Sequence, residues 1–173
     1  APLSASLKGD HTIFVVANKK GNTKNGRILD GQVGNYAWGH HGVYGQSLVN
    51  NTSPSLNTSS VHTAASASVK MLQTFNRTAG GRYVHRVDGD SIAIYRASDD
   101  PSGEMIDINQ GASGYSSSCR VFEVIVYNTA LSVAEIEIVE SYLMTKYGLG
   151  TNKNSYKTSR GNPTYDVSSP YNN

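Results

Sequence analysis

The chain has 173 residues and a formal net charge of +2, which suits one domain with one sizeable core. Charged residues make up only 16% of the sequence, so it lacks the basic surface that nucleic-acid binding requires. The single cysteine, Cys119, excludes an intrachain disulfide, and no apolar run is long enough to span a membrane.

The first third of the chain is expected to form strands separated by polar segments. Residues 11–17 (His-Thr-Ile-Phe-Val-Val-Ala) are apolar on both alternating faces, which predicts a strand covered on both sides. A short strand is expected at 27–30. A Gly-rich segment with aromatic and His side chains follows at 31–45, and a long polar loop is expected at 46–60.

Strand character returns at residues 66–75 and continues in a predicted hairpin. The turn sequence Asp88-Gly89-Asp90 lies between two strand-like runs, 82–87 and 91–97. Asp-Gly between such runs is a strong β-hairpin signal, because the turn needs residues that tolerate positive φ. A turn rich in Asp, Pro and Gly is expected next, at 99–103.

Residues 121–127 are expected to form a buried strand. Both of their alternating faces are largely apolar, which predicts a central position in a layered β fold. Simple alternation assigns one face to Phe122, Val124 and Val126, and the other face to Val121, Glu123, Ile125 and Tyr127.

A capped helix is predicted directly after this strand. Ser132 suits the N-cap, Glu135 completes a capping box, and Gly148 suits a left-handed residue beyond the C-terminus. An apolar stripe at helical spacing is formed by Ile136, Val139, Leu143 and Tyr147. The acidic residues of this helix are expected to form a solvated face rather than a catalytic or metal site: Glu135, Glu137 and Glu140.

After Leu149 the sequence becomes polar and poor in aliphatic residues, so residues 150–173 cannot build a core of their own. We therefore divide the chain into a β-sandwich domain at 1–149 and an extended tail at 150–173. The tail is either disordered or an arm that lies along a neighbour. We favour the arm, anchored by Tyr156, Tyr165 and Tyr171.

The segment Glu123–Leu149 resembles the closing part of a laminin-G-like domain of the concanavalin A-like lectin/glucanase superfamily. Residues 11–17, Gly26–Asp30 and the Trp38-Gly39 region are similar to that family's opening, and the Val87-Asp88-Gly89 turn is similar to its mid-domain hairpin. The resemblance covers about residues 5–149. It implies an all-β fold with two antiparallel sheets in a jelly-roll sandwich and one short C-terminal helix near 132–147. Only Ala1–Gly9 precede the first predicted strand, so a sheet edge is expected to be open, and the tail of the same or a neighbouring copy is a candidate to cover it.

Carbohydrate binding is the most plausible chemistry for the Gly-rich segment. Sugars stack on aromatic rings and hydrogen-bond to planar polar groups, and five such residues are close in sequence: Tyr36, Trp38, His40, His41 and Tyr44. The alternative is that Trp38 packs inside the sandwich and the other four are ordinary edge residues.

No resident cofactor is expected, although calcium is an open alternative. Some laminin-G relatives bind calcium through Asp side chains and backbone carbonyls, which here implies Asp88, Asp90, Asp99 and Asp100. These residues also suit turns, where Asp is favoured for local hydrogen bonds. The acidic strand motif of the superfamily's glucanases, Glu-x-Asp-x-Glu, does not occur, so we expect no enzyme activity.

Three functions follow in order. The first is a noncatalytic structural or assembly module of a virion, appendage or extracellular layer, with other copies of the chain as partners. The second is a carbohydrate-binding adhesion module, with a glycan as partner. A glycoside hydrolase is the third and is disfavoured. The chain starts at Ala1 rather than Met, which indicates processing or trimming, and we expect an extracellular, cell-surface or virion-surface location.

Overall fold

The computed structural model describes residues 2–19, 27–31, 37–38, 47–49, 56–58, 70–78, 80–96, 105–109, 118–149, 156–157 and 163–165. In this part of the chain the fold is an antiparallel β-sandwich with one α-helix, as predicted. None of the described helices is long and apolar enough to cross a membrane.

The large sheet has five antiparallel strands, in the order β11 (Cys119–Tyr127), β2 (His11–Lys19), β7 (Met71–Thr78), β8 (Arg82–Val87) and β9 (Asp90–Arg96). The small sheet has four, in the order β1 (Pro2–Ser6), β10 (Met105–Ile108), β3 (Leu29–Gly31) and β4 (Ala37–Trp38). Two short pairs complete the described strands: β5 (Ser47–Val49) with β6 (Leu56–Thr58), and β12 (Tyr156–Lys157) with β13 (Pro163–Tyr165).

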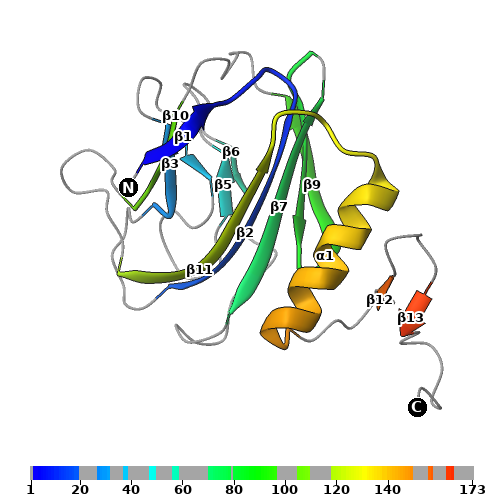
Figure 1. The fold of residues 1–173 in the computed structure, drawn as a ribbon. Coiled ribbons are helices and arrows are strands. Elements are labelled where there is room, and N and C mark those ends of the chain that lie inside the picture. Colours follow the sequence, from blue (N-terminus) through cyan, green and yellow to red (C-terminus); the bar gives the residue numbers. More distant parts are fainter. Residues whose placement is uncertain are drawn as a thin grey trace.

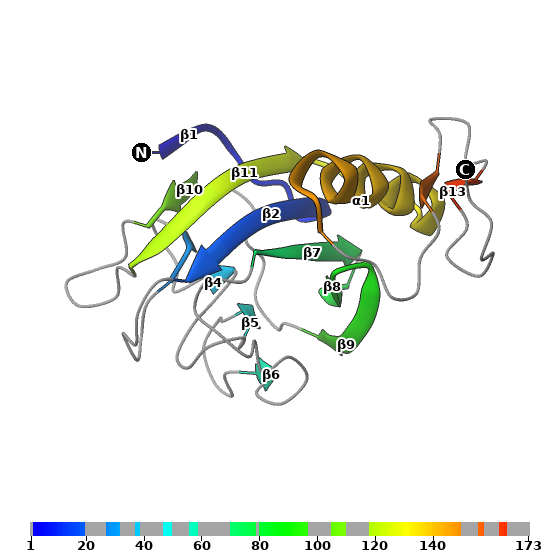
Figure 2. The same cartoon turned by 90° about the horizontal axis from the view of Figure 1, so that it is seen from below.

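The large sheet lies between the small sheet and helix α1 (Val133–Tyr147), so the molecule has three layers (Figures 1 and 2). Alternate residues of β2 serve the two interfaces. Ile13 and Val15 pack toward the small sheet, whereas Phe14 and Val16 pack toward the helix. This explains why both faces of the predicted strand at 11–17 are apolar.

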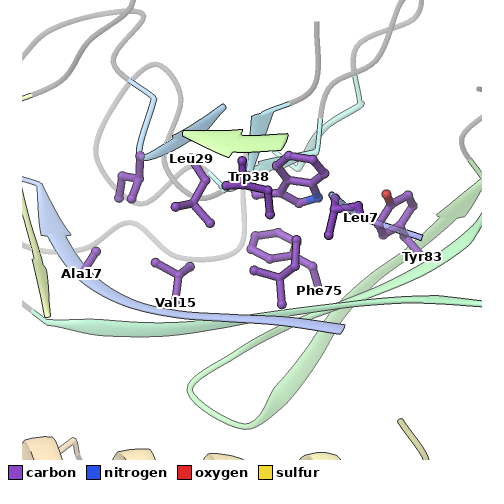
Figure 3. Close-up of a cluster of buried hydrophobic side chains, with 10 residues drawn as sticks. Leu7, Val15, Ala17, Leu29, Trp38, Phe75 and Tyr83 are labelled. Atoms are coloured by element: carbon purple, nitrogen blue, oxygen red, sulfur yellow. The ribbon is translucent and has the colours of Figure 1, made fainter. Parts of the chain in front are cut away.

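The core between the sheets joins side chains that are distant in sequence. Figure 3 shows Leu29 and Trp38 of the small sheet on one side, and Val15, Ala17 and Phe75 of the large sheet on the other. Cys119, on β11, is partly buried and packs against this core.

Strand β11 corrects two predictions. It is the end strand of the large sheet and not a central one, although the core and the helix cover both of its faces. A register shift between Val121 and Glu123 also breaks the expected alternation. Because of this bulge, Val121 faces the core together with Val124 and Val126, and Phe122 faces the helix together with Ile125 and Tyr127.

Helix α1 confirms the predicted caps. The Glu135 backbone N–H donates to Ser132 Oγ at 3.3 Å, and the Ser132 N–H donates to Glu135 Oε2 at 2.8 Å. Gly148 adopts φ +59° in the left-handed region, where L residues with a Cβ are strained. The hairpin is confirmed as well, with Asp88 and Gly89 at positive φ between β8 and β9.

Two polar regions contain more structure than expected. The loop predicted at 46–60 contains the β5–β6 pair, because backbone pairing does not require apolar side chains. In the tail, β12 and β13 pair with each other and place Tyr156 opposite Tyr165. Strand β12 lies against α1 (Figure 1). Tyr171 lies outside the described residues, and the tail's role in assembly stays a prediction.

Candidate functional site

Trp38 belongs to the core. Its side chain is 0% exposed and packs with the large sheet, and Leu29 is its partner in the β3–β4 ladder. Trp38 therefore packs inside the sandwich, which was the alternative to a sugar-binding role, and its indole offers no surface for a sugar ring. Tyr36, His40, His41 and Tyr44 lie outside the described residues, so the carbohydrate site that they would form stays a prediction.

His11 is buried between the Trp38 and Tyr83 rings. Its ring is 0% exposed and meets the Trp38 and Tyr83 rings edge-on, at centroid distances of 6.2 and 5.6 Å. The Lys8 carbonyl lies 3.0 Å from Nδ1 and can only accept, so Nδ1 carries the proton. Nε2 then accepts from the Tyr83 hydroxyl at 3.2 Å. Both ring nitrogens are therefore satisfied in the neutral imidazole.

Burial lowers the pKa of His11 to about 4, and the neighbouring positive charge of Arg77 adds to this effect. Between pH 6.5 and 4 the unfolded chain therefore binds a proton that the folded chain does not. We expect the free energy of unfolding to fall by about 3 kcal/mol as the pH decreases through this window. Above pH 6.5 the stabilising contribution of the neutral His11 should be fully present.

Urea denaturation of the unaltered chain and of His11→Gln, measured from pH 4 to 8, tests this expectation. Asp and Glu residues titrate in both proteins, so the difference between the two isolates His11. Its share of the pH dependence should disappear in the variant. Equal slopes in the two proteins would show that His11 is protonated as easily in the folded chain as in the unfolded one.

A second cluster of polar residues lies on the face of the small sheet that points away from the core. Leu29, Ile106 and Ile108 pack toward the core, so the alternate residues Asp30 and Asp107 lie on the outer face. They are direct partners in the β3–β10 ladder, which places their Cβ atoms about 5 Å apart. Like charges in such a pair are unfavourable by themselves.

Asp30 is the more buried of the two, with 4% of its surface exposed. Arg27 Nη1 donates to its Oδ1 at 2.8 Å, whereas its Oδ2 has no hydrogen-bond donor within the described part of the chain. Burial raises the pKa of Asp30, and the neighbouring Asp107 charge adds to the increase, against the effect of Arg27. Sequence reasoning missed this pair, because nothing local shows that residues 30 and 107 meet.

The predicted calcium set is only partly described. Asp88 Oδ1 accepts the Leu72 backbone N–H at 2.9 Å, and Asp90 begins β9 opposite Val87. Asp88 thus ties the hairpin turn to β7, as expected for a turn residue. Asp99 and Asp100 lie outside the described residues. No group of three His, Cys, Asp or Glu residues suited to a metal occurs among the described residues, and calcium binding stays a prediction.

Glu140 corrects the expectation that the helix acids form a solvated face. It is 2% exposed and accepts two hydrogen bonds from Arg86, from Nε to Oε1 and from Nη2 to Oε2, both at 2.9 Å. Thr74 Oγ1 also donates to Oε1 at 2.8 Å. The sequence contained a signal for this burial. Glu140 follows Ile136 by four residues, so it lies on the same face of the helix as the apolar stripe.

The layers described above define an antiparallel β-sandwich with one helix packed on its large sheet. The predicted fold is confirmed at this level, and the assignment to the concanavalin A-like superfamily and to its laminin-G-like domains stays a prediction. No protein-family model and no curated protein matches the sequence. The class therefore rests on the fold that the chain shares with solved structures.

Domain 4 of an extracellular arabinanase from Geobacillus stearothermophilus, in complex with arabinotriose, matches with a TM-score of 0.63 at 10% identity, over 78% of this chain and 68% of that one. A heptameric SAP-like pentraxin from Limulus polyphemus matches with a TM-score of 0.58 at 13% identity, over 80% and 74%. A sialidase from Trypanosoma rangeli matches with a TM-score of 0.57 at 17% identity, over 80% and 23%, so the chain spans less than a quarter of that enzyme.

Proposed function

We propose that the chain is a noncatalytic carbohydrate-binding module that acts at an extracellular or particle surface. The observation that carries this proposal is the position of β4. Ala37 is the partner of Asp30 in the β3–β4 ladder, and the Asp30 carboxylate is paired with the Arg27 guanidinium. Tyr36, His40, His41 and Tyr44 flank this strand in the sequence. Rings and planar polar groups together suit a sugar.

The shared fold supports the same proposal, because the arabinanase domain that has this fold is in complex with arabinotriose. Three of the described acids outside the small sheet have structural roles. Glu135 caps the helix, Glu140 pairs with Arg86, and Glu123 accepts from Lys146 at 3.0 Å. Release of reducing sugar from a bound oligosaccharide would contradict the noncatalytic part of the proposal.

A glycan array tests the binding function. We expect the unaltered chain to retain at least one oligosaccharide, and Tyr36→Ala and Tyr44→Ala to weaken that binding by about tenfold, since a stacked ring contributes about 1–2 kcal/mol. Tyr142→Ala is the matched control, because Tyr142 is 52% exposed on α1, away from the small sheet. If millimolar glycans fail to bind the unaltered chain, the proposal is wrong.

Assembly is a second candidate function, and the end position of β11 favours it. Within the described part of the chain no strand pairs with the outer edge of this nine-residue strand. An edge of that length can accept a strand from another copy, and the tail with Tyr156, Tyr165 and Tyr171 is our candidate. Light scattering of the chain with and without residues 150–173 tests this. A monomer in both cases would contradict it.

A further inference from the structure

Asn76, Arg77 and Thr78 form an Asn-x-Thr triplet, which is the acceptor sequence for N-glycosylation. Such acceptors are expected in surface loops, where a glycan extends into solvent. Here the triplet ends β7, the middle strand of the large sheet. Asn76 pairs with Thr12 of β2 on one side and with Val84 of β8 on the other, so neighbouring strands flank it on both sides.

The Asn76 side chain is buried where the β11–α1 connection crosses the sheet, and only 7% of the residue is exposed. Its Nδ2 donates to the Leu131 carbonyl at 3.0 Å. Because that carbonyl can only accept, the contact identifies the nitrogen of the amide. The Thr12 hydroxyl lies 3.0 Å from both Asn76 Oδ1 and the Thr129 carbonyl oxygen.

These contacts fix the start of the helix on the sheet. The Thr12 hydroxyl also accepts the Leu131 backbone N–H at 3.0 Å, so Leu131 is held through its carbonyl by Asn76 and through its N–H by Thr12. Leu131 immediately precedes Ser132, the N-cap of α1. The Asn76 amide therefore anchors the segment that leads into the helix.

We propose that N-glycosylation of Asn76 and folding of this chain exclude each other, so the folded protein carries no glycan at this sequon. A glycan is attached through Nδ2, the same atom that holds the Leu131 carbonyl. Even one sugar ring is larger than the Asn side chain, and a side chain buried at the packing density of a protein interior leaves no room for it. A transferase can therefore modify only the unfolded chain, and a modified chain cannot close α1 onto the sheet. This inference is independent of the sugar-binding function proposed above.

Expression with a secretion signal in a eukaryotic host that N-glycosylates tests the exclusion. We expect mass spectrometry to find Asn76 unmodified throughout the secreted, folded fraction, with any glycan at Asn76 confined to retained, misfolded chains. Phe14→Asp puts a charge into the core at a residue that is 0% exposed, which keeps the chain unfolded and leaves the sequon accessible. Asn76 should be glycosylated in that variant.

Two results would overturn the inference. One is a glycan on Asn76 in chains that unfold cooperatively. The other is an unmodified Asn76 in Phe14→Asp, because folding would then not be what protects the sequon.

A second measurement, on chains made in a cytoplasm that does not glycosylate, tests the contact itself. Asn76→Asp replaces the donor Nδ2 with an oxygen that faces the Leu131 carbonyl. We expect urea denaturation at neutral pH to show an increase of about tenfold or more in the equilibrium constant for unfolding.

Asn128→Asp is the matched control. It makes the same change on an exposed residue of the same connection and keeps Oδ1, which accepts the Lys8 backbone N–H at 3.2 Å. We expect it to change the equilibrium constant for unfolding by less than about threefold. If the two variants are equally stable, the fold does not need Nδ2 and the inference is wrong.

Discussion

Replacing Glu140 with alanine is expected to lower the free energy of unfolding by about 3–5 kcal/mol, because the change leaves a buried guanidinium without its counter-ion. Arg86 is buried beneath the helix, and besides Glu140 its Nη2 donates to the Gly89 carbonyl at 2.7 Å. The Thr74 hydroxyl loses its acceptor in the same variant. Urea denaturation at neutral pH measures the loss.

Glu137→Ala is the matched control, because Glu137 is on the same helix and partly exposed. We expect it to cost less than about 1 kcal/mol. The double variant Arg86→Met/Glu140→Leu should recover most of the lost stability, because it removes the buried charge instead of leaving it unpaired. If Glu140→Ala costs no more than Glu137→Ala, the ion pair does not hold the helix on the sheet.

Replacing Trp38 with alanine is expected to cost about 3–5 kcal/mol, which is typical when a large aromatic side chain is removed from a packed core. Trp38 is on β4, the end strand of the small sheet, and it contacts the large sheet from there. The loss should therefore weaken the interface between the two sheets and the packing around His11 at the same time.

Thermal and urea denaturation, together with glycan binding, distinguish this role from a surface role. A core residue gives a destabilised protein, and Trp38→Phe, which keeps an aromatic ring, should lose less than half as much stability. A sugar-stacking residue would instead lose binding with little change in stability. Tyr142→Ala should change the free energy of unfolding by only about 0.5 kcal/mol.

Local signals in the sequence were sufficient for several elements. The caps of α1 depend on contacts between residues three or four positions apart, so Ser132, Glu135 and Gly148 could be assigned without a structure. The hairpin at Asp88–Gly89 is local in the same sense. The two apolar faces of β2 also predicted correctly that it is covered on both sides.

The candidate site depends on contacts between distant residues. Whether Asp30 is alone or faces a second carboxylate depends on the register of β3 against β10, and these strands are separated by more than seventy residues. The burial of Trp38 depends in the same way on how the two sheets pack. Residue type marked Tyr36–Tyr44 as a candidate segment, but it did not show which of its rings would face the core.

Hydrophobic periodicity and capping act over a few residues, so a layered β fold, the capped helix and the hairpin could be predicted from the sequence. The edge position and bulge of β11, the burial of Glu140 against Arg86 and the pairing of Asp30 with Asp107 became visible only in the folded chain. The energy of a strand pair or a buried charge depends on its partner in the folded chain. That partner is distant in sequence, so the residues nearby do not reveal it.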